Sequence, residues 1–314
     1  MRSHNPHGRR LHLPVVPVDG VGLQRKPDWL RARLNPVGPN FGRIKEIVRS
    51  GGLHTVCEEA SCPNIAECWE DREATFLVLG DRCTRRCGFC DVMTAKPLPP
   101  DEDEPARIAE AVERMGLAYA VLTGVARDDL PLGGAQLWAE CVRAIRDRVP
   151  DCGVEVLPPD FSGDEEAVGT VIGAAPDVFA HNLETVRRLH TKMRPAFDYD
   201  RSLDVLRMAK RLRPGQITKS NLILGMGERP DEVAAALSDL ADAGCEIVTL
   251  GQYLQPSRHH APVDRWVTPD EFAAYEGTGE SMGIAHVESG PLVRSSYRAG
   301  RQRRAAVGSG GAGL

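Results

Sequence analysis

The sequence predicts an α/β protein: a partial (β/α)6 TIM-type barrel with N-terminal and C-terminal extensions. From Thr75 onward, short β-prone apolar segments alternate with helical segments, the alternation that builds a parallel sheet. The strand segments are apolar almost throughout, as expected for a parallel sheet covered by helices. Right-handed crossovers curl such a sheet into a barrel. Polar residues follow the strands, at the rim where barrels place their chemistry.

Apolar runs, glycines and helix caps place the elements in order. The expected strands are Thr75–Leu79, Ala118–Thr123, Val154–Leu157, Asp177–His181, Thr218–Leu224 and Glu246–Gly251. The expected helices are Phe41–Arg49, Pro105–Met115, Ala135–Val149, Glu165–Ile172, Leu183–His190, Ser202–Leu212 and Pro230–Ala243. A last helix is expected to begin at Pro269, behind Thr268 as its N-cap.

Four parts are expected along the chain. An extended, proline-rich segment is anchored to the body by Trp29 and Leu30, and a cysteine-rich segment follows it. The barrel comes next, and then a C-terminal tail whose GSGGAGL end is expected to be disordered. The expected boundaries are 1–40, 41–74, 75–290 and 291–314.

Polar side chains gather where the expected strands end, and they mark the expected active face. For any single residue, the ordinary polarity of loops is an equally good explanation. These residues are Asp81, Arg82, Arg127 to Asp129, Asp160, Asn182, Glu184, Glu228, Gln252 and Tyr253.

Composition excludes several classes of protein. The formal net charge of −5 argues against nonspecific nucleic-acid binding. No run of about 18 apolar residues is present, so no transmembrane helix is expected. The N-terminus is basic up to Asp19, as transit peptides are, but Pro14 and Pro17 interrupt an amphipathic helix. We therefore expect a flexible bacterial leader and a cytoplasmic protein.

Cysteine usage favours metal binding in a reducing compartment. Six of the nine cysteines fall in two tight triads, and no signal peptide is evident. The remaining Cys141, Cys152 and Cys245 lie in or beside helical and strand segments. They are expected to be buried as small hydrophobic side chains.

The first triad is Cys83, Cys87 and Cys90 in CTRRCGFC, directly after the first expected strand. Three thiolates can hold three irons of a [4Fe–4S] cluster and leave the fourth iron open for chemistry. A structural zinc site or packed core thiols are the alternatives, but zinc prefers four ligands and no second pair lies nearby. With Phe89 before its last cysteine, the triad resembles the signature of radical SAM enzymes. There the open iron binds S-adenosylmethionine, whose reductive cleavage yields a 5′-deoxyadenosyl radical.

The second triad is Cys57, Cys62 and Cys68 in CEEASCPNIAECW. Pro63 and Asn64 supply a turn that lets a short segment fold around a cluster. Three more thiolates so close to the first triad argue against a chance grouping of core cysteines.

Both triads, together with five further motifs, resemble the lipoyl synthase family of radical SAM enzymes. These enzymes insert sulfur into a protein-bound octanoyl chain. The resemblance covers Phe41 to Ala299 and implies a barrel of the radical SAM kind. The further motifs are TGVARDDL (123–130), HNLETV (181–186), KSNLILGMGE (219–228), GQYLQPS (251–257) and GPLVRSSY (290–297).

The resemblance implies a role for each triad. The first triad would hold the cluster that binds and cleaves S-adenosylmethionine. The second would hold an auxiliary [4Fe–4S] cluster, with Ser296 of RSSY on its fourth iron, and this cluster is thought to be consumed as the sulfur source. A hard serine oxygen among soft thiolates suits a cluster that must open. Without the resemblance, Ser296 would be read as an ordinary loop hydroxyl.

The implied chemistry explains why cofactors are needed. No side chain attacks an unactivated methylene C–H bond, so a cofactor must supply the radical. Sulfur enters at C6 and C8, and two S-adenosylmethionine molecules are used per product. Expected contacts to this cofactor are Thr123, Gly124, Asn182 and Glu184, for which a capping or rim role is the alternative. Arg294 is expected to order the tail or to approach the substrate carbonyl.

Partners follow from the same resemblance. They are octanoylated lipoyl-carrier domains (2-oxoacid dehydrogenase E2 subunits and the glycine cleavage H protein), a ferredoxin- or flavodoxin-type reductant and an iron–sulfur carrier. No nucleic-acid or membrane partner is expected. A basic run near the C-terminus is either a solvated tail or a surface that steers an acidic carrier domain. This run consists of Arg298, Arg301, Arg303 and Arg304.

Two segments depart from the family pattern. Leu132 stands where the family usually has an acidic residue. Residues 275–283 carry two internal glycines in an expected helix, at a cost of about 1 kcal/mol each.

Two other function classes compete with sulfur insertion into an octanoyl chain. One is another radical SAM enzyme, an RNA methylthiotransferase or a biotin synthase-like protein. The methylthiotransferase would want a basic nucleic-acid-binding appendage, whereas only a short glycine-rich tail follows Arg304. The other is a non-enzymatic iron–sulfur carrier, which leaves the six βα units and their polar rim without a purpose.

Overall fold

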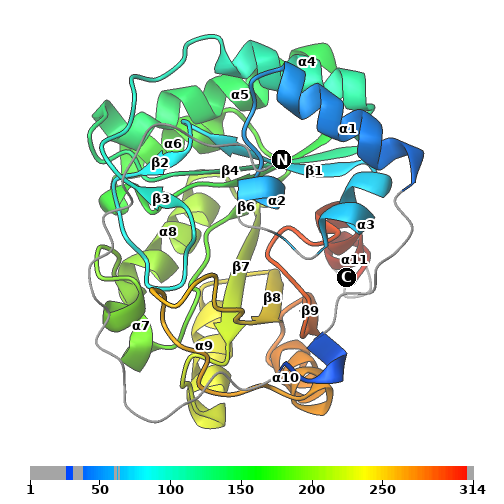
Figure 1. Ribbon diagram of the computed structural model, residues 1–314. Coiled ribbons are helices and arrows are strands. Elements are labelled where there is room, and N and C mark those ends of the chain that lie inside the picture. Colours follow the sequence, from blue (N-terminus) through cyan, green and yellow to red (C-terminus); the bar gives the residue numbers. More distant parts are fainter. Residues whose placement is uncertain (1–25, 31–37, 60–61, 63, 310–314) are drawn as a thin grey trace.

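The computed structural model describes residues 26–30, 38–59, 62 and 64–309. Its centre is a curved, fully parallel sheet in which each strand pairs with the next one along the chain, with helices on its outer face (Figure 1). This confirms the predicted partial TIM-type barrel. The strands are β1 (Glu73–Val78), β4 (Tyr119–Gly124), β5 (Gly153–Leu157), β6 (Val178–Ala180), β7 (Ile217–Leu224), β8 (Ile247–Gln252) and β9 (His286–Gly290).

The remaining elements flank this sheet. Two short strands, β2 (Arg82–Cys83) and β3 (Met93–Thr94), pair separately. The helices before β4 are η1 (Asp28–Leu30), α1 (Pro39–Ser50), α2 (Val56–Glu59), α3 (Ile65–Glu70) and α4 (Glu104–Met115). Those after it are η2 (Pro131–Gly134), α5 (Ala135–Arg148), η3 (Phe161–Gly163), α6 (Glu165–Gly173), α7 (Arg187–Met193), α8 (Tyr199–Leu212), α9 (Pro230–Asp242), α10 (Pro269–Ser281) and α11 (Ala299–Ser309).

All six predicted strands are present, and the sheet has a seventh, β9, that the sequence did not reveal. Its segment HVESG contains a single strongly apolar residue, Val287, which is buried opposite Val248 of β8. An edge strand needs only one apolar face, so its sequence carries a weak strand signal.

Helix α7 begins at Arg187, so the prediction of a helix from Leu183 was wrong. The preceding backbone pairs with β7 instead: the Glu184 amide donates to the Asn221 carbonyl at 2.8 Å, and the Ile223 amide donates to the Glu184 carbonyl at 2.8 Å. Glu184 has a φ of +68°, which a helix does not allow.

Other local predictions can be compared with the structure directly. Helix α10 has the predicted cap, a capping box of Thr268 with Glu271. Its Gly279 packs closely on β9, since a Cβ there would lie 2.9 Å from Val287 Cγ2. Leu132, which stands where the family usually has an acidic residue, has a φ of +49° and packs against the apolar core. The three cysteines outside the triads are buried, as predicted.

Both chain ends required a correction. Leu30 is buried, but Trp29 is 44% exposed, so only Leu30 anchors the N-terminal segment. Arg298 pairs with Glu67, and Arg303 pairs with Asp177 at 2.9 Å, so these two arginines do not belong to a solvated tail. The rest of the extended N-terminal segment (1–25 and 31–37) and the last residues (310–314) lie outside the described residues. Within the part of the chain that is described, no helix is long and apolar enough to cross a membrane.

The C-terminal tail crosses the end of β8 at Gly251. A Cβ on Gly251 would lie 2.1 Å from the Val293 carbonyl oxygen, so only glycine permits this approach. One residue before the crossing, the Leu292 carbonyl accepts from Asn64 Nδ2 at 2.7 Å. The tail is therefore held between the rim of the barrel and the segment that carries the second triad.

We predict that Gly251→Ala lowers the free energy of unfolding by about 1–3 kcal/mol, the usual cost of overpacking, because the tail backbone must move. Urea unfolding measures this. The matched control is Gly277→Ala in α10, where a Cβ would meet nothing within 4 Å. It is expected to be neutral or to stabilise by up to about 1 kcal/mol. Equal losses in both variants would contradict the close crossing.

Candidate active site

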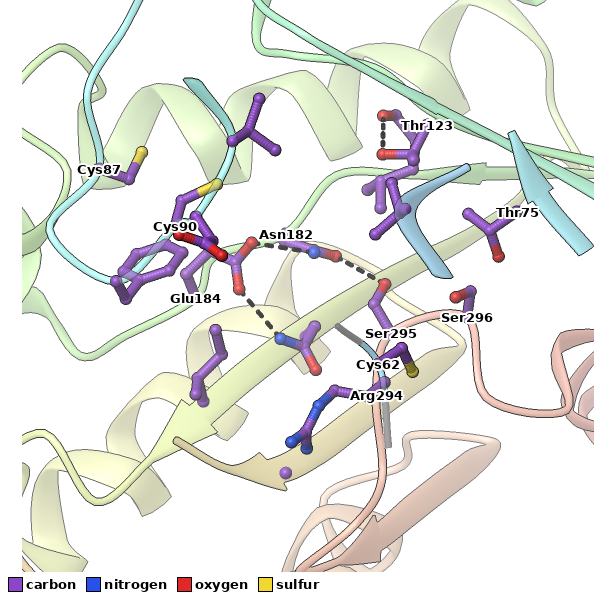
Figure 2. Close-up of a pocket in the computed structure, with 18 of the residues that line it drawn as sticks. Cys62, Thr75, Cys87, Cys90, Thr123, Asn182, Glu184, Arg294, Ser295 and Ser296 are labelled. Carbon is purple, nitrogen blue, oxygen red and sulfur yellow. Dashed lines mark hydrogen bonds between the residues drawn. The ribbon is translucent and has the colours of Figure 1, made fainter. Parts of the chain in front are cut away.

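A cavity of about 560 Å³ lies at the C-terminal ends of the barrel strands. Its walls come from β4 to β8, from the loop after β1 and from the C-terminal tail. All three cysteines of the first triad and two of the second line it. Figure 2 shows Cys87 and Cys90 on one side of this cavity and Cys62 with Ser296 on the other. The structure thus brings the two triads to one space.

Hydrogen bonds shape the loop of the first triad. The pairing of β2 with β3 brings the two ends of this loop together. The backbone amides of Arg85 and Ala126 donate to Cys83 Sγ at 3.4 and 3.3 Å. Amide donors of this kind stabilise a sulfur that carries negative charge.

Two further loops fix the far side of the first triad. The Gly88 amide donates to the Met193 carbonyl at 2.8 Å, and the Gly88 carbonyl accepts from the Ala261 amide at 2.8 Å. His260 Nε2 lies 3.0 Å from the Cys90 carbonyl oxygen. The triad loop is therefore clamped between the end of α7 and the loop after β8.

Arg85, between the first two cysteines of the triad, joins three βα loops. Its guanidinium forms a bidentate pair with Asp128, and Nη1 donates to Asp160 Oδ1 at 2.5 Å. Asp160 is fully buried and also accepts from Arg201 Nε at 2.6 Å. Burial works against its charge, yet the neighbouring cations hold the pKa of Asp160 below its ordinary value. The guanidinium of Arg85 also stacks on the Phe197 ring at 4.5 Å.

In the second triad, Cys57 lies on α2, Cys68 lies on α3 and Cys62 lies between these two helices. A small cavity of about 20 Å³ is lined by its three cysteines together with Ser296. Cys57 and Cys62 line the large cavity as well. The second triad therefore stands at the edge of the large cavity, with the predicted fourth ligand beside it.

Polar contacts bring Ser296 to this place. Tyr297 Oη donates to Glu67 Oε1 at 3.2 Å, and Arg298 forms a short ion pair with the same carboxylate. Glu67 precedes Cys68 on α3. Together with the bond from Asn64 to the Leu292 carbonyl, these contacts join the tail to the segment of the second triad on both sides of Ser296.

The donor set fits iron–sulfur clusters. Burial raises the pKa of all six triad thiols, including those of Cys57 and Cys87 to about 11 and that of Cys90 to about 12. Such thiols bind as thiolates only when a metal supplies compensating positive charge. Across residues 26–30, 38–59, 62 and 64–309, no three His, Cys, Asp or Glu side chains are placed to hold one metal ion. A cubane asks for a different arrangement, because each thiolate binds its own iron.

Asn182 and Glu184 lie between the triads (Figure 2). Asn182 Nδ2 and Asn221 Nδ2 each donate to one carboxylate oxygen of Glu184 at 3.0 Å. Thr249 Oγ1 donates to Asn221 Oδ1 at 2.8 Å, and Ser295 Oγ donates to Asn182 Oδ1 at 3.2 Å. Burial raises the pKa of Glu184. These contacts fix a polar ridge in the middle of the cavity.

Thr123 and Gly124, the other two predicted contacts, line the cavity at the end of β4. Thr123 Oγ1 donates to the Leu157 carbonyl at 3.4 Å. A Cβ on Gly124 would lie 2.5 Å from Trp138 Cζ2, so packing against α5 by itself calls for glycine here.

Sequence reasoning missed four polar residues of the site: Arg85, His181, Arg194 and Asn221. Burial lowers the pKa of His181 to about 4, so its imidazole is neutral, and Nδ1 lies 3.1 Å from the Pro158 carbonyl oxygen. Arg194 Nη1 donates to the Asn182 carbonyl at 2.7 Å. The position of Arg85 inside the triad was an available signal. Arg194 is the residue directly after α7, and no sequence motif marks it.

Fold and first triad together define a class of protein. A partial parallel barrel with a CxxxCxxC loop after its first strand is the arrangement of the radical SAM enzymes. The model of the radical SAM superfamily matches residues 77–240. Proteins of this class use a [4Fe–4S] cluster and S-adenosylmethionine.

Similarity that extends beyond the barrel points to one family within this class. The model of the N-terminal domain of lipoyl synthase matches residues 17–62. The lipoyl synthase of Mycobacterium ulcerans is 58% identical over 296 residues, which cover 94% of this chain and 90% of that relative. The lipoyl synthase of Acidothermus cellulolyticus is 55% identical over 309 residues, with 98% and 95% covered. The chain belongs to the lipoyl synthase family.

Solved structures share the fold at low sequence identity. The hydrogenase maturase HydG has a TM-score of 0.54 at 15% identity, covering 78% of this chain and 62% of that one. Methylornithine synthase has a TM-score of 0.51 at 16% identity, covering 62% and 56%. At these identities the similarities show a shared fold.

We predict that Asp160→Asn lowers the free energy of unfolding by about 3 kcal/mol. This value is at the lower end for a broken buried ion pair, because Arg85 still has its second carboxylate partner, Asp128. Urea unfolding measures the loss. The matched control is Asp200→Asn, whose carboxylate also lies 2.6 Å from an arginine, Arg187, but is 65% exposed. Its loss is expected to stay under about 1 kcal/mol. Similar losses would refute a special role for the buried pair.

Proposed function

We propose that this protein carries out the lipoyl synthase reaction, the radical insertion of two sulfur atoms at C6 and C8 of a protein-bound octanoyl-lysine chain. The observation that carries the proposal is that the first cysteine triad and two cysteines of the second line one cavity. A radical formed beside the first triad and a sulfur source beside the second would share this space. Such an arrangement limits radical attack to the bound chain.

The two triads would hold two [4Fe–4S] clusters. When bound, the catalytic cluster with S-adenosylmethionine supplies the 5′-deoxyadenosyl radical and the auxiliary cluster supplies the sulfur. The backbone amides directed at Cys83 Sγ would stabilise its thiolate form. The proposed catalytic-cluster ligands are Cys83, Cys87 and Cys90. The proposed auxiliary-cluster ligands are Cys57, Cys62, Cys68 and Ser296.

The polar ridge would orient S-adenosylmethionine. Asn182 and Glu184, held by hydrogen bonds, would present fixed acceptors and donors to its ribose or methionine end, and Thr123 with Gly124 would contact it from β4. Preorganised contacts of this kind hold the reacting bond in place without a conformational cost at the moment of reaction.

Apolar side chains offer the acyl chain a site between the triads. They come from β1, β5, β7, the loop after β4 and the tail, and a saturated chain packs against such walls while water is excluded. These residues are Leu77, Val125, Leu157, Ile223 and Val293.

The partners follow from this function. The substrates are octanoylated lipoyl-carrier proteins, which we take to be 2-oxoacid dehydrogenase E2 subunits and the glycine cleavage H protein. A ferredoxin- or flavodoxin-type protein would supply electrons, and an iron–sulfur carrier would rebuild the auxiliary cluster. We place the protein in the cytoplasm. Residues 41–74 and 291–314 would serve the auxiliary cluster, and residues 75–290 would serve radical formation.

The reaction itself is the first test. The anaerobically reconstituted protein, given S-adenosylmethionine, dithionite and an octanoyl-lysine peptide, is expected to yield 5′-deoxyadenosine and a dithiolated peptide, as detected by mass spectrometry. Cys83→Ala is expected to abolish 5′-deoxyadenosine formation, because the catalytic cluster loses one of three ligands. Turnover by this variant would refute the catalytic assignment, and cofactor cleavage without a gain of peptide mass would indicate another radical SAM reaction.

The serine ligand has its own test. Ser296→Ala is expected to keep cofactor cleavage but to reduce the dithiolated product roughly tenfold or more, since even outer-shell partners of a metal site commonly contribute that much. Ser295→Ala is the matched control, because this neighbouring serine bonds to Asn182 instead. The Ser295→Ala variant is expected to keep the iron content of the auxiliary site. Normal product from Ser296→Ala would rule out the serine ligand.

A further inference from the structure

Arginines around the cavity fall into two groups. Arg85, Arg127 and Arg298 each form an ion pair with a carboxylate. Within the described part of the chain, Arg194 and Arg294 form no ion pair with any carboxylate. Both donate to backbone carbonyls, and for Arg294 this is the adjacent Val293 carbonyl, at 2.7 Å.

Arg294 lies at the second triad. Its side chain lines both the large cavity and the small cavity that the three cysteines share with Ser296. In Figure 2 the backbone end of Arg294 lies beside Cys62, and its guanidinium points away from this thiol. The guanidinium of Arg294 lies at the tail crossing, because a Cβ built on Gly251 would be 3.4 Å from Arg294 Nη1.

Arg294 is half-buried, and a cation without a carboxylate partner is stabilised when an anionic group lies beside it. Three thiolates around a [4Fe–4S] core give a net negative group at this place. Among the described residues, no carboxylate pairs with Arg294. A cluster at the second triad, whose cavity Arg294 lines, would supply the counter-charge.

The sulfur step increases that negative charge. A C–S bond contains two electrons: the carbon radical brings one, and the sulfide brings a lone pair. One electron is left over, and it remains on the irons. A fixed cation beside the cluster lowers the energy of this more reduced state.

We propose that Arg294 is the charge partner of the auxiliary cluster: its fixed positive charge raises the reduction potential of that cluster and so favours C–S bond formation. This inference rests on the proposed function, because it requires a cluster at the second triad. Arg294 acts through the cluster and takes no part in cleaving S-adenosylmethionine.

The test isolates the auxiliary cluster in the full-length chain. A parent protein carrying Cys83→Ala, Cys87→Ala and Cys90→Ala is reconstituted anaerobically, and its potential is measured by redox titration followed by electron paramagnetic resonance. Arg294→Gln in this parent is expected to shift the potential to more negative values, and Arg294→Lys, which keeps the charge, is expected to stay close to the parent. Arg301→Gln is the matched control, since it removes the same charge from an exposed position on α11.

Each outcome decides something. An unchanged potential in Arg294→Gln, or an equal shift in Arg301→Gln, overturns the proposal. If Arg294→Gln takes up no iron, Arg294→Lys decides alone: the parent potential supports a role for the charge, and a large shift overturns it. A parent that takes up no iron contradicts the proposed auxiliary cluster itself. In the chain with an intact first triad, a raised KM for the octanoyl peptide with no change of potential would assign Arg294 to substrate binding and overturn the proposal.

Discussion

Seven strands pair in parallel in the order of the chain, and every one of them ends at the same rim. This direction is what makes a single site out of distant segments. The first triad follows β1, Asn182 follows β6, Asn221 lies near the end of β7, and the tail follows β9. Because these ends meet, side chains from residue 57 to residue 296 line one cavity. Barrels of parallel strands concentrate chemistry at this face for the same reason.

Buried charge gives the rim its rigidity. Asp160 joins Arg85 of the triad loop to Arg201 of α8, and Lys219 of β7 pairs with Glu155 of β5 inside the barrel at 2.8 Å. A buried ion is stable only while its partner stays in place, so each pair resists separation of the elements it joins. The polar ridge around Glu184 adds neutral hydrogen bonds to this frame. Loops that carry radical chemistry are thus held in one geometry.

The second triad depends on contacts between the two ends of the chain. Asn64 bonds to the Leu292 carbonyl, and Glu67 accepts from Tyr297, across more than 200 residues of sequence. The tail can lie there because Gly251 lets its backbone approach β8. Ser296 and Arg294 therefore reach the triad through a crossing that lies outside the barrel's own repeat.

Local sequence determined the strands of the barrel, most of its helices and the two triads, because apolar periodicity, capping residues and cysteine spacing are properties of neighbours in the chain. It failed where the deciding contact is distant. Strand β9 is stabilised by β8, α7 begins only after the pairing of Glu184 with β7, and Trp29 is 44% exposed although its neighbour Leu30 is buried. The ties of Arg85 to Asp128 and Asp160 and the place of Arg294 beside Cys62 were decided only by the tertiary structure. Residues far apart in sequence carry no mark of which buried charge they will meet, because folding alone brings them together.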